Sequence, residues 1–334
     1  MHRNRRVAVG VEIGGGKATV ALIDRQGRVL QRVHARTLRG RPAPATLDPY
    51  MRAIDTLLAA AREEGLYVCG LGVSIPGTLD ASARRLQQVP LLPSLNGFPL
   101  GDLLEARYRL PTQLLVDVDA AVLGEHRFGA GKGYCRLLFL TVNAVVGASL
   151  VVNGRLEPLG NNYAGHVCHL PVAANGPRCS CGKHGCVNTL VSTDAMLRIV
   201  QRALRRGVET GLTRRLLNHE YFSLQLLVEE AERGDRVALQ VYSEIGRWLG
   251  TAIAKYIHFC EPDVLVLGGG AFYTSDPLLF QIRNVLGSQG ESTPLLQGVE
   301  ILPARLGSDA VLVGTVIPLF DPPAASRTVI EACM

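Results

Sequence analysis

Three cysteines and a histidine in the middle of the chain have the types and spacing of metal ligands. Cys179, Cys181 and Cys186 lie within eight residues of one another, and His169 stands upstream of them. Structural zinc takes cysteine sulfur and histidine nitrogen in this number, and the glycines between the cysteines let the backbone wrap around an ion. The pattern therefore predicts a closed, tetrahedral zinc site.

The residues alone leave the fourth ligand open, because Cys168, His166 and His184 are also nearby. A disulfide with a spare thiol is the competing interpretation. It would need an oxidising compartment and usually a small, cysteine-dense chain. Since this chain has 334 residues and eight cysteines, we favour zinc.

Length and composition are those of a globular protein with ample core. A chain of 334 residues with 47% hydrophobic content predicts two domains. The apolar run Val7 to Ile13 ends at a glycine triplet and is too short for a secretion signal or a membrane span, so we expect a cytoplasmic location. The net charge of +6 is spread over single arginines, which suits nucleotide phosphates as well as nucleic acid.

Two segments of the chain repeat one pattern. Arg6 to Ile23 reads as a strand, a tight glycine turn and a second strand. Arg136 to Leu156 reads as a strand, a loop at Asn143 to Gly147, a second strand and a turn at Asn153-Gly154. Similar openings about 130 residues apart predict a duplicated α/β architecture with two related halves and a cleft between them.

Hydrophobic periodicity predicts the remaining elements. We expect helices at Thr46 to Glu64, with Thr46 as a cap, and at Asp194 to Arg206, Leu224 to Arg233 and Val237 to His258. We expect buried strands at Cys69 to Ser74, Thr112 to Val116 and Val264 to Leu267, the last of which leads into Gly268-Gly269-Gly270. The chain is expected to cross between domains near Asp117 to Gly129.

The order of these motifs resembles the ROK family of repressors, open reading frames and sugar kinases, which has the actin- and hexokinase-like ATPase fold. The zinc segment is the most specific match, because it is similar to the family's Cys-x-Cys-Gly-x-x-Gly-Cys signature. The other matching segments are Val7 to Lys17, Ser74 to Gly77, Val116 to Glu125, Asn161 to Pro171, Glu261 to Gly270 and Gly307 to Gly314.

The resemblance implies an α/β, duplicated actin-like (ribonuclease H-like) fold of two domains with a cleft between them. Residues 1–118, completed by 308–334, would form the smaller domain, and residues 119–307 would form the larger one with the zinc loop. His169 would be the fourth zinc ligand, and the protein would be a homodimer. Family repressors carry a winged helix ahead of the first strand, where this chain has six residues, so direct DNA binding is not expected.

Asp117 is the candidate catalytic base. It follows the apolar run Leu114 to Val116, at the carboxyl end of a strand where α/β proteins place ligands. Taken alone, it is better interpreted as a capping or turn residue before the helix Ala120 to Arg127, although Asp119 could serve as that cap instead. The resemblance implies that Asp117 is the general base of a sugar kinase.

The resemblance also implies a site for ATP and Mg²⁺. Gly14, Gly15, Gly16 and Lys17 would form the first phosphate loop, Glu12 would hold Mg²⁺ through water, and Gly268, Gly269 and Gly270 would lie against adenosine. The residues themselves also fit a plain hairpin and a strand-to-helix turn. Glu12 and Gly16 replace the family's Asp and Thr, and Asn143-Ala144-Val145 replaces Gly-Thr-Gly in the second phosphate loop, leaving Gly147 nearby.

The sugar would lie beside seven residues according to the same resemblance. These are Gly77, Ser94, Asn96, Asp117, His166, His169 and Asn188. His166 and Asn188 stand where the family has glutamates, and Val116 and Ser94 stand where it has asparagines. We therefore consider two hypotheses, a kinase for a hexose or derivative other than plain glucose and a non-catalytic sugar- or nucleotide-sensing protein. An NAD-dependent oxidoreductase is disfavoured, because neither glycine triplet has the Gly-x-Gly-x-x-Gly spacing.

Overall fold

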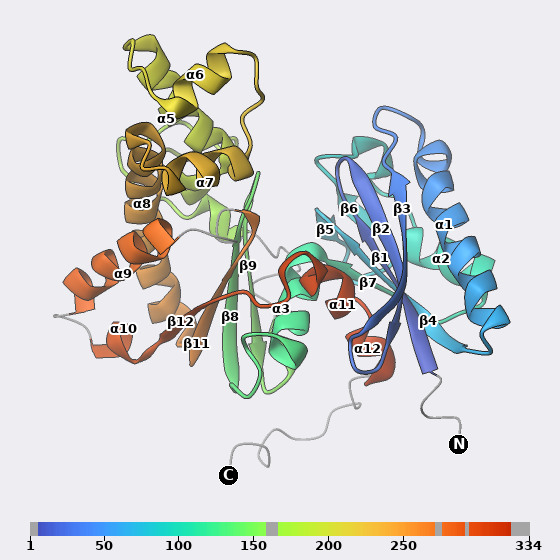
Figure 1. Cartoon of the computed structure of the whole chain (residues 1–334). Helices are drawn as coiled ribbons and strands as arrows, with labels where there is room; N and C mark the ends of the chain where they lie inside the picture. The colour runs from blue at the N-terminus through green and yellow to red at the C-terminus, as the bar shows by residue number, and fades with distance from the viewer. Residues whose placement is uncertain (1–5, 158–165, 271–275, 291–293, 322–334) are drawn as a thin grey trace. The chain divides into compact units, whose positions relative to one another are not determined.

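The computed structural model describes residues 6–157, 166–270, 276–290 and 294–321. These residues form two five-stranded sheets flanked by helices (Figure 1). The strand orders are β3-β2-β1-β4-β7 and β10-β9-β8-β11-β12. The two orders are equivalent, which confirms the predicted duplication within an α/β fold. Across the described ranges, no helix combines the length and apolar character that a membrane crossing requires.

The first sheet begins with a three-stranded antiparallel meander and continues with parallel strands. Its strands are β1 (Arg6–Ile13), β2 (Lys17–Asp24), β3 (Val29–Arg36), β4 (Tyr67–Ile75) and β7 (Thr112–Val116). Its helices are α1 (Ala43–Glu63), α2 (Leu100–Tyr108), α3 (Asp117–Phe128), α11 (Ala310–Gly314) and α12 (Ile317–Phe320). A small hairpin of β5 (Thr78–Leu79) and β6 (Leu86–Gln88) precedes a short 3-10 helix, Pro93–Leu95.

Side chains along β1 point alternately to the two faces of the first sheet, and helices cover both faces. Val11 lines a small apolar space together with Leu47 and Tyr50 of α1. Ala8, on the opposite face, packs with Leu312 of α11. Every residue from Val7 to Gly10 is buried, as expected for a central strand between two layers of helices.

Helix α1 begins three residues before the predicted cap. Pro42 is its N-cap and Pro44 lies in its first turn, where the missing proline N–H costs no hydrogen bond. The prediction of Thr46 as the cap is therefore wrong. The Thr46 hydroxyl instead lies 3.2 Å from the carbonyl oxygen of Leu38 and 3.1 Å from that of Arg41, and so secures the segment before the helix.

The second sheet repeats the first. Its strands are β8 (Arg136–Val142), β9 (Val146–Val152), β10 (Arg155–Glu157), β11 (Val264–Gly268) and β12 (Glu300–Pro303). Its helices are α4 (Val187–Val191), α5 (Thr193–Arg205), α6 (Gly211–Leu217), α7 (Leu224–Glu232), α8 (Arg236–Cys260), α9 (Asp276–Gly290) and α10 (Pro294–Gly298). Val146 and Gly147 belong to β9, so the loop before it is shorter than the sequence predicts.

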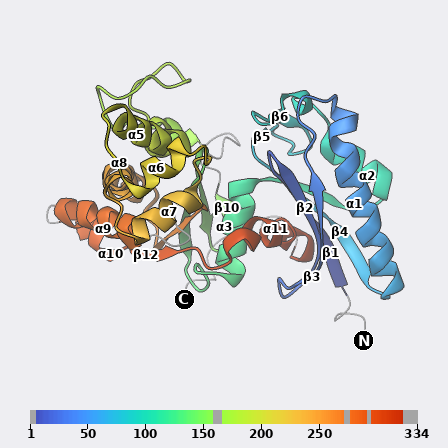
Figure 2. The same ribbon diagram turned by 45° about the horizontal axis from the view of Figure 1, so that its top comes forward.

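Helices α8 and α9 run beside each other in both views (Figures 1 and 2). A Cβ atom on Gly246 would come within 2.6 Å of Gln281, and one on Gly250 within 2.8 Å of Val285. These glycines allow the two helices to approach closely. Helices α5, α6 and α7 pack against α8, and Ser192 caps α5 by accepting from the Ala195 amide.

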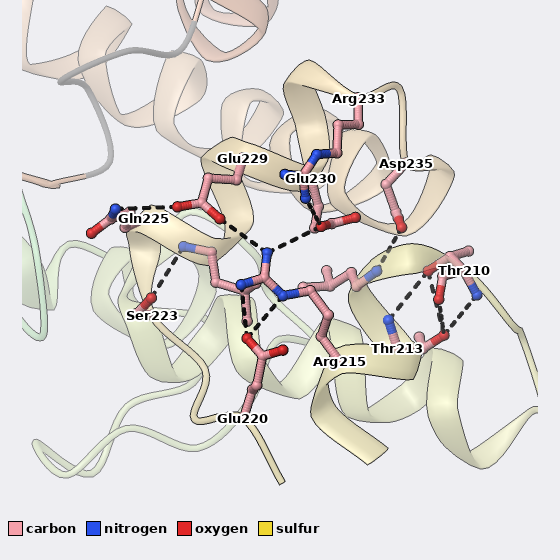
Figure 3. A network of polar contacts seen from close by, with 12 residues as sticks. Thr210, Thr213, Arg215, Glu220, Ser223, Gln225, Glu229, Glu230, Arg233 and Asp235 are labelled. Carbon is pink, nitrogen blue, oxygen red and sulfur yellow. Dashed lines mark hydrogen bonds and ion pairs between the residues drawn. The ribbon is translucent and has the colours of Figure 1, made fainter. Parts of the chain in front are cut away.

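An ion-pair network joins α6 to α7 (Figure 3). The Arg215 guanidinium lies 2.7 Å from Glu220, 2.9 Å from Glu229 and 3.2 Å from Glu230. Glu230 is buried and is also 2.6 Å from Arg233. Because a buried carboxylate is costly without partners, the two arginines are needed for this packing.

Asp235 links the same helices to the start of α8. Its side chain accepts hydrogen bonds from the amides of Val237 and Ala238 in the first turn of α8. Its second oxygen accepts from the Leu212 amide of α6. One carboxylate therefore satisfies amides of two helices that would otherwise lack partners.

The described chain groups into two compact units. The first contains the residues up to Cys135, those from Ser149 to Glu157 and those from Ser308 to Asp321. The second contains Arg136–Ala148 and the residues from His166 to Gly307. Helix α3 groups with the first unit, so this unit extends past residue 118, where the border was expected. The segment that begins at residue 308 also groups with the first unit. The domain division of 1–118 with 308–334 and 119–307 stays a prediction.

Helices α3 and α11 cross at two glycines, which gives a testable expectation for stability. A Cβ atom on Gly314 would collide with the Ala120 carbonyl, and one on Gly124 with the Ala310 carbonyl. We expect Gly314→Ala to destabilise the protein by about 1–3 kcal/mol, because the new Cβ atom would collide with the backbone of Ala120. Urea unfolding followed by circular dichroism measures the loss.

Gly287→Ala is the matched control. Gly287 lies exposed in α9, and a Cβ atom there meets nothing within 4 Å. Alanine should stabilise an open helical position by about 0.5–1 kcal/mol. Equal effects of the two substitutions would contradict the close crossing of α3 and α11.

Candidate functional site

Glu12 and Asp117 lie at the same edge of the first sheet. In the parallel pairing, Glu12 of β1 is opposite Ser74 of β4, and Ile75 of β4 is opposite Val116 of β7. Asp117 follows directly as the first residue of α3. Because the carboxyl ends of parallel strands meet at one edge, the two carboxyl groups come together where α/β folds bind ligands.

Both carboxyl groups hold their protons more tightly than usual. Burial raises the pKa of Asp117 to about 6, with the charge of Asp119 adding to the effect and the Val118 amide opposing it. Burial and then the charge of Asp117 raise the pKa of Glu12 to about 7, while Lys17 acts in the opposite direction. A carboxylate whose pKa lies near neutrality is suited to accept a proton from a hydroxyl group.

Asp119 has a structural partner. Its Oδ1 accepts a hydrogen bond of 2.6 Å from the Ser149 hydroxyl, so the capping role considered for it is not what its side chain does. Asp117 Oδ1 accepts from the Val118 amide at 2.8 Å. Asp117 thus meets one amide in the first turn of α3 and is half-buried at the edge of the sheet.

Gly14, Gly15 and Gly16 form the turn between β1 and β2. The Gly14 amide donates to the Lys17 carbonyl at 2.9 Å, and a Cβ atom on Gly14 would lie 2.7 Å from that carbonyl. At Gly16 a Cβ atom would meet nothing within 4 Å. The backbone of the turn is therefore closely packed at Gly14, whereas Gly16 has free space beside it.

The segment after β3 holds the carbonyl groups of this turn. Thr37 donates from its hydroxyl to the Gly14 carbonyl at 2.8 Å and from its amide to the Gly16 carbonyl at 3.2 Å. Arg39 Nε donates to the Gly15 carbonyl. These residues were not among the sequence candidates, because the strand before Thr37 was not predicted.

Gly268, Gly269 and Gly270 end β11 and leave the second sheet. Gly269 has a φ of +93°, which favours glycine. The Gly270 amide donates to Asn143 Oδ1 at 2.9 Å. The turn predicted to face adenosine is therefore tied to the loop at Asn143.

That loop, Asn143 to Val145, is fastened at two further points. The Asn143 carbonyl accepts from the Thr193 amide at 3.1 Å. Asn188 Oδ1 accepts from the Val146 amide at 3.0 Å. Asparagine side chains thus occupy the amide directly after the predicted second phosphate loop and the Gly270 amide of the turn after β11. Gly147 lies buried in β9 just beyond it.

The predicted sugar residues lie in separate parts of the chain. Gly77 follows β4, where a Cβ atom would collide with the Gln88 carbonyl. Ser94 is exposed in the 3-10 helix, and Asn96 Oδ1 accepts from the Val89 amide at 2.7 Å. His166 begins the 3-10 helix His166–His169, and its side chain lies outside the described part of the structure.

His169, Cys179, Cys181 and Cys186 converge as predicted. Their ligand atoms all lie within 4.8 Å of one another. The sulfurs of Cys181 and Cys186 are 3.7 Å apart. Two sulfurs bound to a tetrahedral zinc at about 2.3 Å would be separated by about 3.8 Å. The donor set and its spacing therefore fit zinc, and the sulfurs are well beyond the disulfide bond length of about 2.05 Å.

The backbone around the cluster is shaped by glycine. Gly182 and Gly185 have φ values of +88° and +62°, so the chain turns sharply before Cys186. The Cys179 amide donates to the Lys183 carbonyl at 2.8 Å. Cys168 and His184, which the sequence left open as ligands, are not members of the convergent group.

Comparison with known proteins gives one consistent family. The sequence profile of the ROK family matches residues 8–319. A glucokinase of Thermotoga maritima is 30% identical over 82% of this chain and 85% of its own length. An N-acetylglucosamine repressor of Escherichia coli is 26% identical over 84% of this chain and 68% of its own length.

A solved structure has the same fold over nearly the whole chain. The crystal structure of a ROK family glucokinase from Streptomyces griseus, in complex with glucose and AMPPNP, aligns with a TM-score of 0.74 and 28% identity. It covers 92% of this chain and 97% of the glucokinase. This likeness confirms the predicted actin-like fold class.

Proposed function

Because the chain belongs to the ROK family, we propose that it is an ATP- and Mg²⁺-dependent kinase for a hexose or hexose derivative, with Asp117 as general base. The observation that carries the proposal is the half-buried Asp117 carboxyl at the carboxyl end of the parallel strand β7, with a pKa raised to about 6. Glucokinases among the relatives support the reaction class.

Asp117 would take the proton of a sugar hydroxyl as the hydroxyl oxygen attacks the terminal phosphorus of ATP. The bond between that phosphorus and the bridging oxygen of ADP breaks in the same in-line transfer. The products are a sugar phosphate and ADP, with the proton on Asp117. The open turn at Gly16 and the Lys17 ammonium offer donors to phosphate oxygens.

Glu12 is the residue proposed to hold Mg²⁺ through water. Its pKa is raised by burial and by the charge of Asp117, and a nearby divalent cation would favour its charged form. Hard oxygen donors of this kind suit Mg²⁺.

His169, Cys179, Cys181 and Cys186 are proposed to hold zinc. The ion would fix the loop and the orientation of His169, which the family resemblance places beside the sugar. His166 and Asn188 stand where carboxylates are expected, and losing two charge-assisted bonds of about 1.5–3 kcal/mol each would weaken glucose binding. We therefore propose a sugar other than plain glucose. The homodimer, the cytoplasmic location and the absence of direct DNA binding stay predictions.

A coupled assay of ADP release tests the function. We expect release with at least one member of a panel of hexoses and N-acetylhexosamines, and none without sugar. Absence of sugar-dependent release across the panel, with no ATP binding by calorimetry, would remove the kinase proposal.

A second candidate function is that of a sugar-sensing regulatory protein that does not catalyse phosphate transfer. The hydrogen bonds of Asn143 to Gly270 and of Asn188 to Val146 favour it, because they occupy one amide of the turn expected to face adenosine and one amide directly after the loop expected to bind phosphate. A repressor among the relatives is in line with such a role. Sugar binding without ADP formation would distinguish this candidate from the kinase.

Asn143→Gly tests whether this side chain competes with nucleotide. The substitution frees the Gly270 amide and lets the loop adopt positive φ. We expect Mg-ATP to bind about two- to tenfold more tightly, the equivalent of one net hydrogen bond of about 0.5–1.5 kcal/mol. Calorimetry without sugar provides the measurement.

Asn143→Asp is the matched control. It keeps the acceptor for the Gly270 amide but adds a negative charge, so Mg-ATP should bind more weakly than to the natural chain. Weaker binding by Asn143→Gly as well would mean that Asn143 supports the nucleotide loop and does not compete with the ligand.

A further inference from the structure

The turn Gly14 to Gly16 is held by hydrogen bonds from a segment that lies 21 or more residues later in the chain. Each of its three carbonyl groups accepts a hydrogen bond from the Thr37 to Arg39 segment. The Thr37 hydroxyl and amide take two of them, and Arg39 takes the third. A plain hairpin needs no such support, so the arrangement calls for an explanation.

The direction of the amides follows from peptide geometry. Peptide bonds in the described residues are trans, and the C=O and N–H groups of one trans peptide point in opposite directions. The Gly14 carbonyl shares its peptide with the Gly15 amide, and the Gly15 carbonyl shares its peptide with the Gly16 amide. Because both carbonyls point to Thr37 and Arg39, both amides point away from them.

Open space and charge favour an anion on the side of these amides. A Cβ atom on Gly16 would meet nothing within 4 Å, so a ligand can approach the backbone there. Lys17 is exposed next to it. Successive amides that point to one side form an anion-binding concavity.

The support continues into the core of the first unit. The Tyr50 hydroxyl of α1 donates to Thr37 Oγ1 at 2.9 Å, and Thr37 Oγ1 donates to the Gly14 carbonyl. Tyr50 is buried, and burial raises the pKa of its hydroxyl, so the group stays protonated as a donor. The chain of bonds fixes the hydroxyl of Thr37 in the orientation that the turn requires.

We propose that Thr37, backed by Tyr50, is a positioning residue that aims the Gly15 and Gly16 amides at the terminal phosphates of a nucleoside triphosphate. Arg39 secures the middle carbonyl of the same turn, and a Cβ atom on Gly15 would crowd the side-chain ends of Leu91 and Arg39. The inference rests on the proposed kinase function for the identity of the anion.

Binding of Mg-ATP without sugar, measured by calorimetry, tests the inference separately from turnover. Thr37→Val keeps the shape but removes both hydroxyl bonds, and we expect the Kd to rise about tenfold. Tyr50→Phe removes one bond, and we expect a rise of about threefold. Thr37→Ser retains the hydroxyl and should bind as the natural chain does.

Tyr108→Phe is the matched control. The Tyr108 hydroxyl of α2 donates to the carbonyl of Met51, which lies in α1 as Tyr50 does, at 3.1 Å. Loss of the Tyr108 hydroxyl therefore removes an equivalent hydrogen bond at another point of α1. Its Mg-ATP affinity should be unchanged, while thermal unfolding should show a cost similar to that of Tyr50→Phe. In all four variants, adenosine should bind as it does to the natural chain, because it carries no phosphate.

The outcomes separate the two proposals. Equal Mg-ATP affinity of Thr37→Val, Tyr50→Phe and Tyr108→Phe overturns the positioning role, even if the natural chain turns over sugar. Weaker binding by the first two variants upholds it, even if no sugar is phosphorylated. Failure of the natural chain to bind Mg-ATP overturns both.

Discussion

Asp117→Asn is expected to lower the turnover number about 10²- to 10⁴-fold, the usual contribution of a positioned general base. The amide keeps an oxygen that can accept from the Val118 amide, as Asp117 Oδ1 does at 2.8 Å. The helix start should therefore stay intact while the proton acceptor is lost. Steady-state kinetics should show a fall in kcat with little change in the KM for ATP.

The pH dependence of the natural chain follows from the same carboxyl group. Asp117 must be deprotonated to accept a proton, and burial raises its pKa to about 6. kcat/KM should therefore fall about tenfold per pH unit below this value. A pH profile that is flat between pH 5 and about 8 would argue against an ionisable base of this kind.

Asp119→Asn is the matched control on the same helical turn. It keeps an oxygen for the Ser149 hydroxyl bond and should retain most of the activity. Removing its charge, which adds to the raised pKa of Asp117, should move the acidic limb of the profile to lower pH. Turnover that survives Asp117→Asn would refute the assignment of the base.

Loss of one proposed zinc ligand is expected to lower both the zinc content and the stability of the protein strongly. Cys181→Ala leaves three ligands, and apparent zinc affinities of structural sites in zinc-finger peptides correspond to about 10–16 kcal/mol. We expect the variant to lose its zinc and more than about 3 kcal/mol of stability. Atomic absorption of the purified protein and urea unfolding measure the two losses.

Cys168→Ala controls for the loss of a buried thiol close to the cluster. Cys168 is buried and lies outside the convergent group, so this variant should keep about one zinc per chain, as a single closed site requires. Natural protein without zinc, or a Cys181→Ala variant that unfolds at the same urea concentration, would contradict a structural zinc site.

Much of the fold could be predicted because buried strands and amphipathic helices have clear periodicities. β7 was predicted at its observed bounds, Thr112–Val116. β3, Val29–Arg36, was not, because its residues alternate only between half-buried and exposed at the edge of the sheet. The start of α1 was misplaced because a proline in the first turn replaced the expected side-chain cap.

The site was predictable where close spacing defines it and unpredictable where distant segments define it. The converging candidates for metal ligands could be found because three of them lie in one short loop. Thr37 and Tyr50 were missed because their bonds join the turn at Gly14, the segment after β3 and α1 through the tertiary fold. Asn188 was considered only as a sugar ligand, whereas its Oδ1 meets the Val146 amide.

Phosphorus NMR of the natural chain with ATP, Mg²⁺ and each sugar of the panel tests the central proposal most directly. We expect a phosphate monoester signal to appear with one sugar at the rate at which ADP forms, and to be absent with Asp117→Asn. ATP that remains unchanged with every sugar, or that yields only inorganic phosphate, would contradict a sugar kinase.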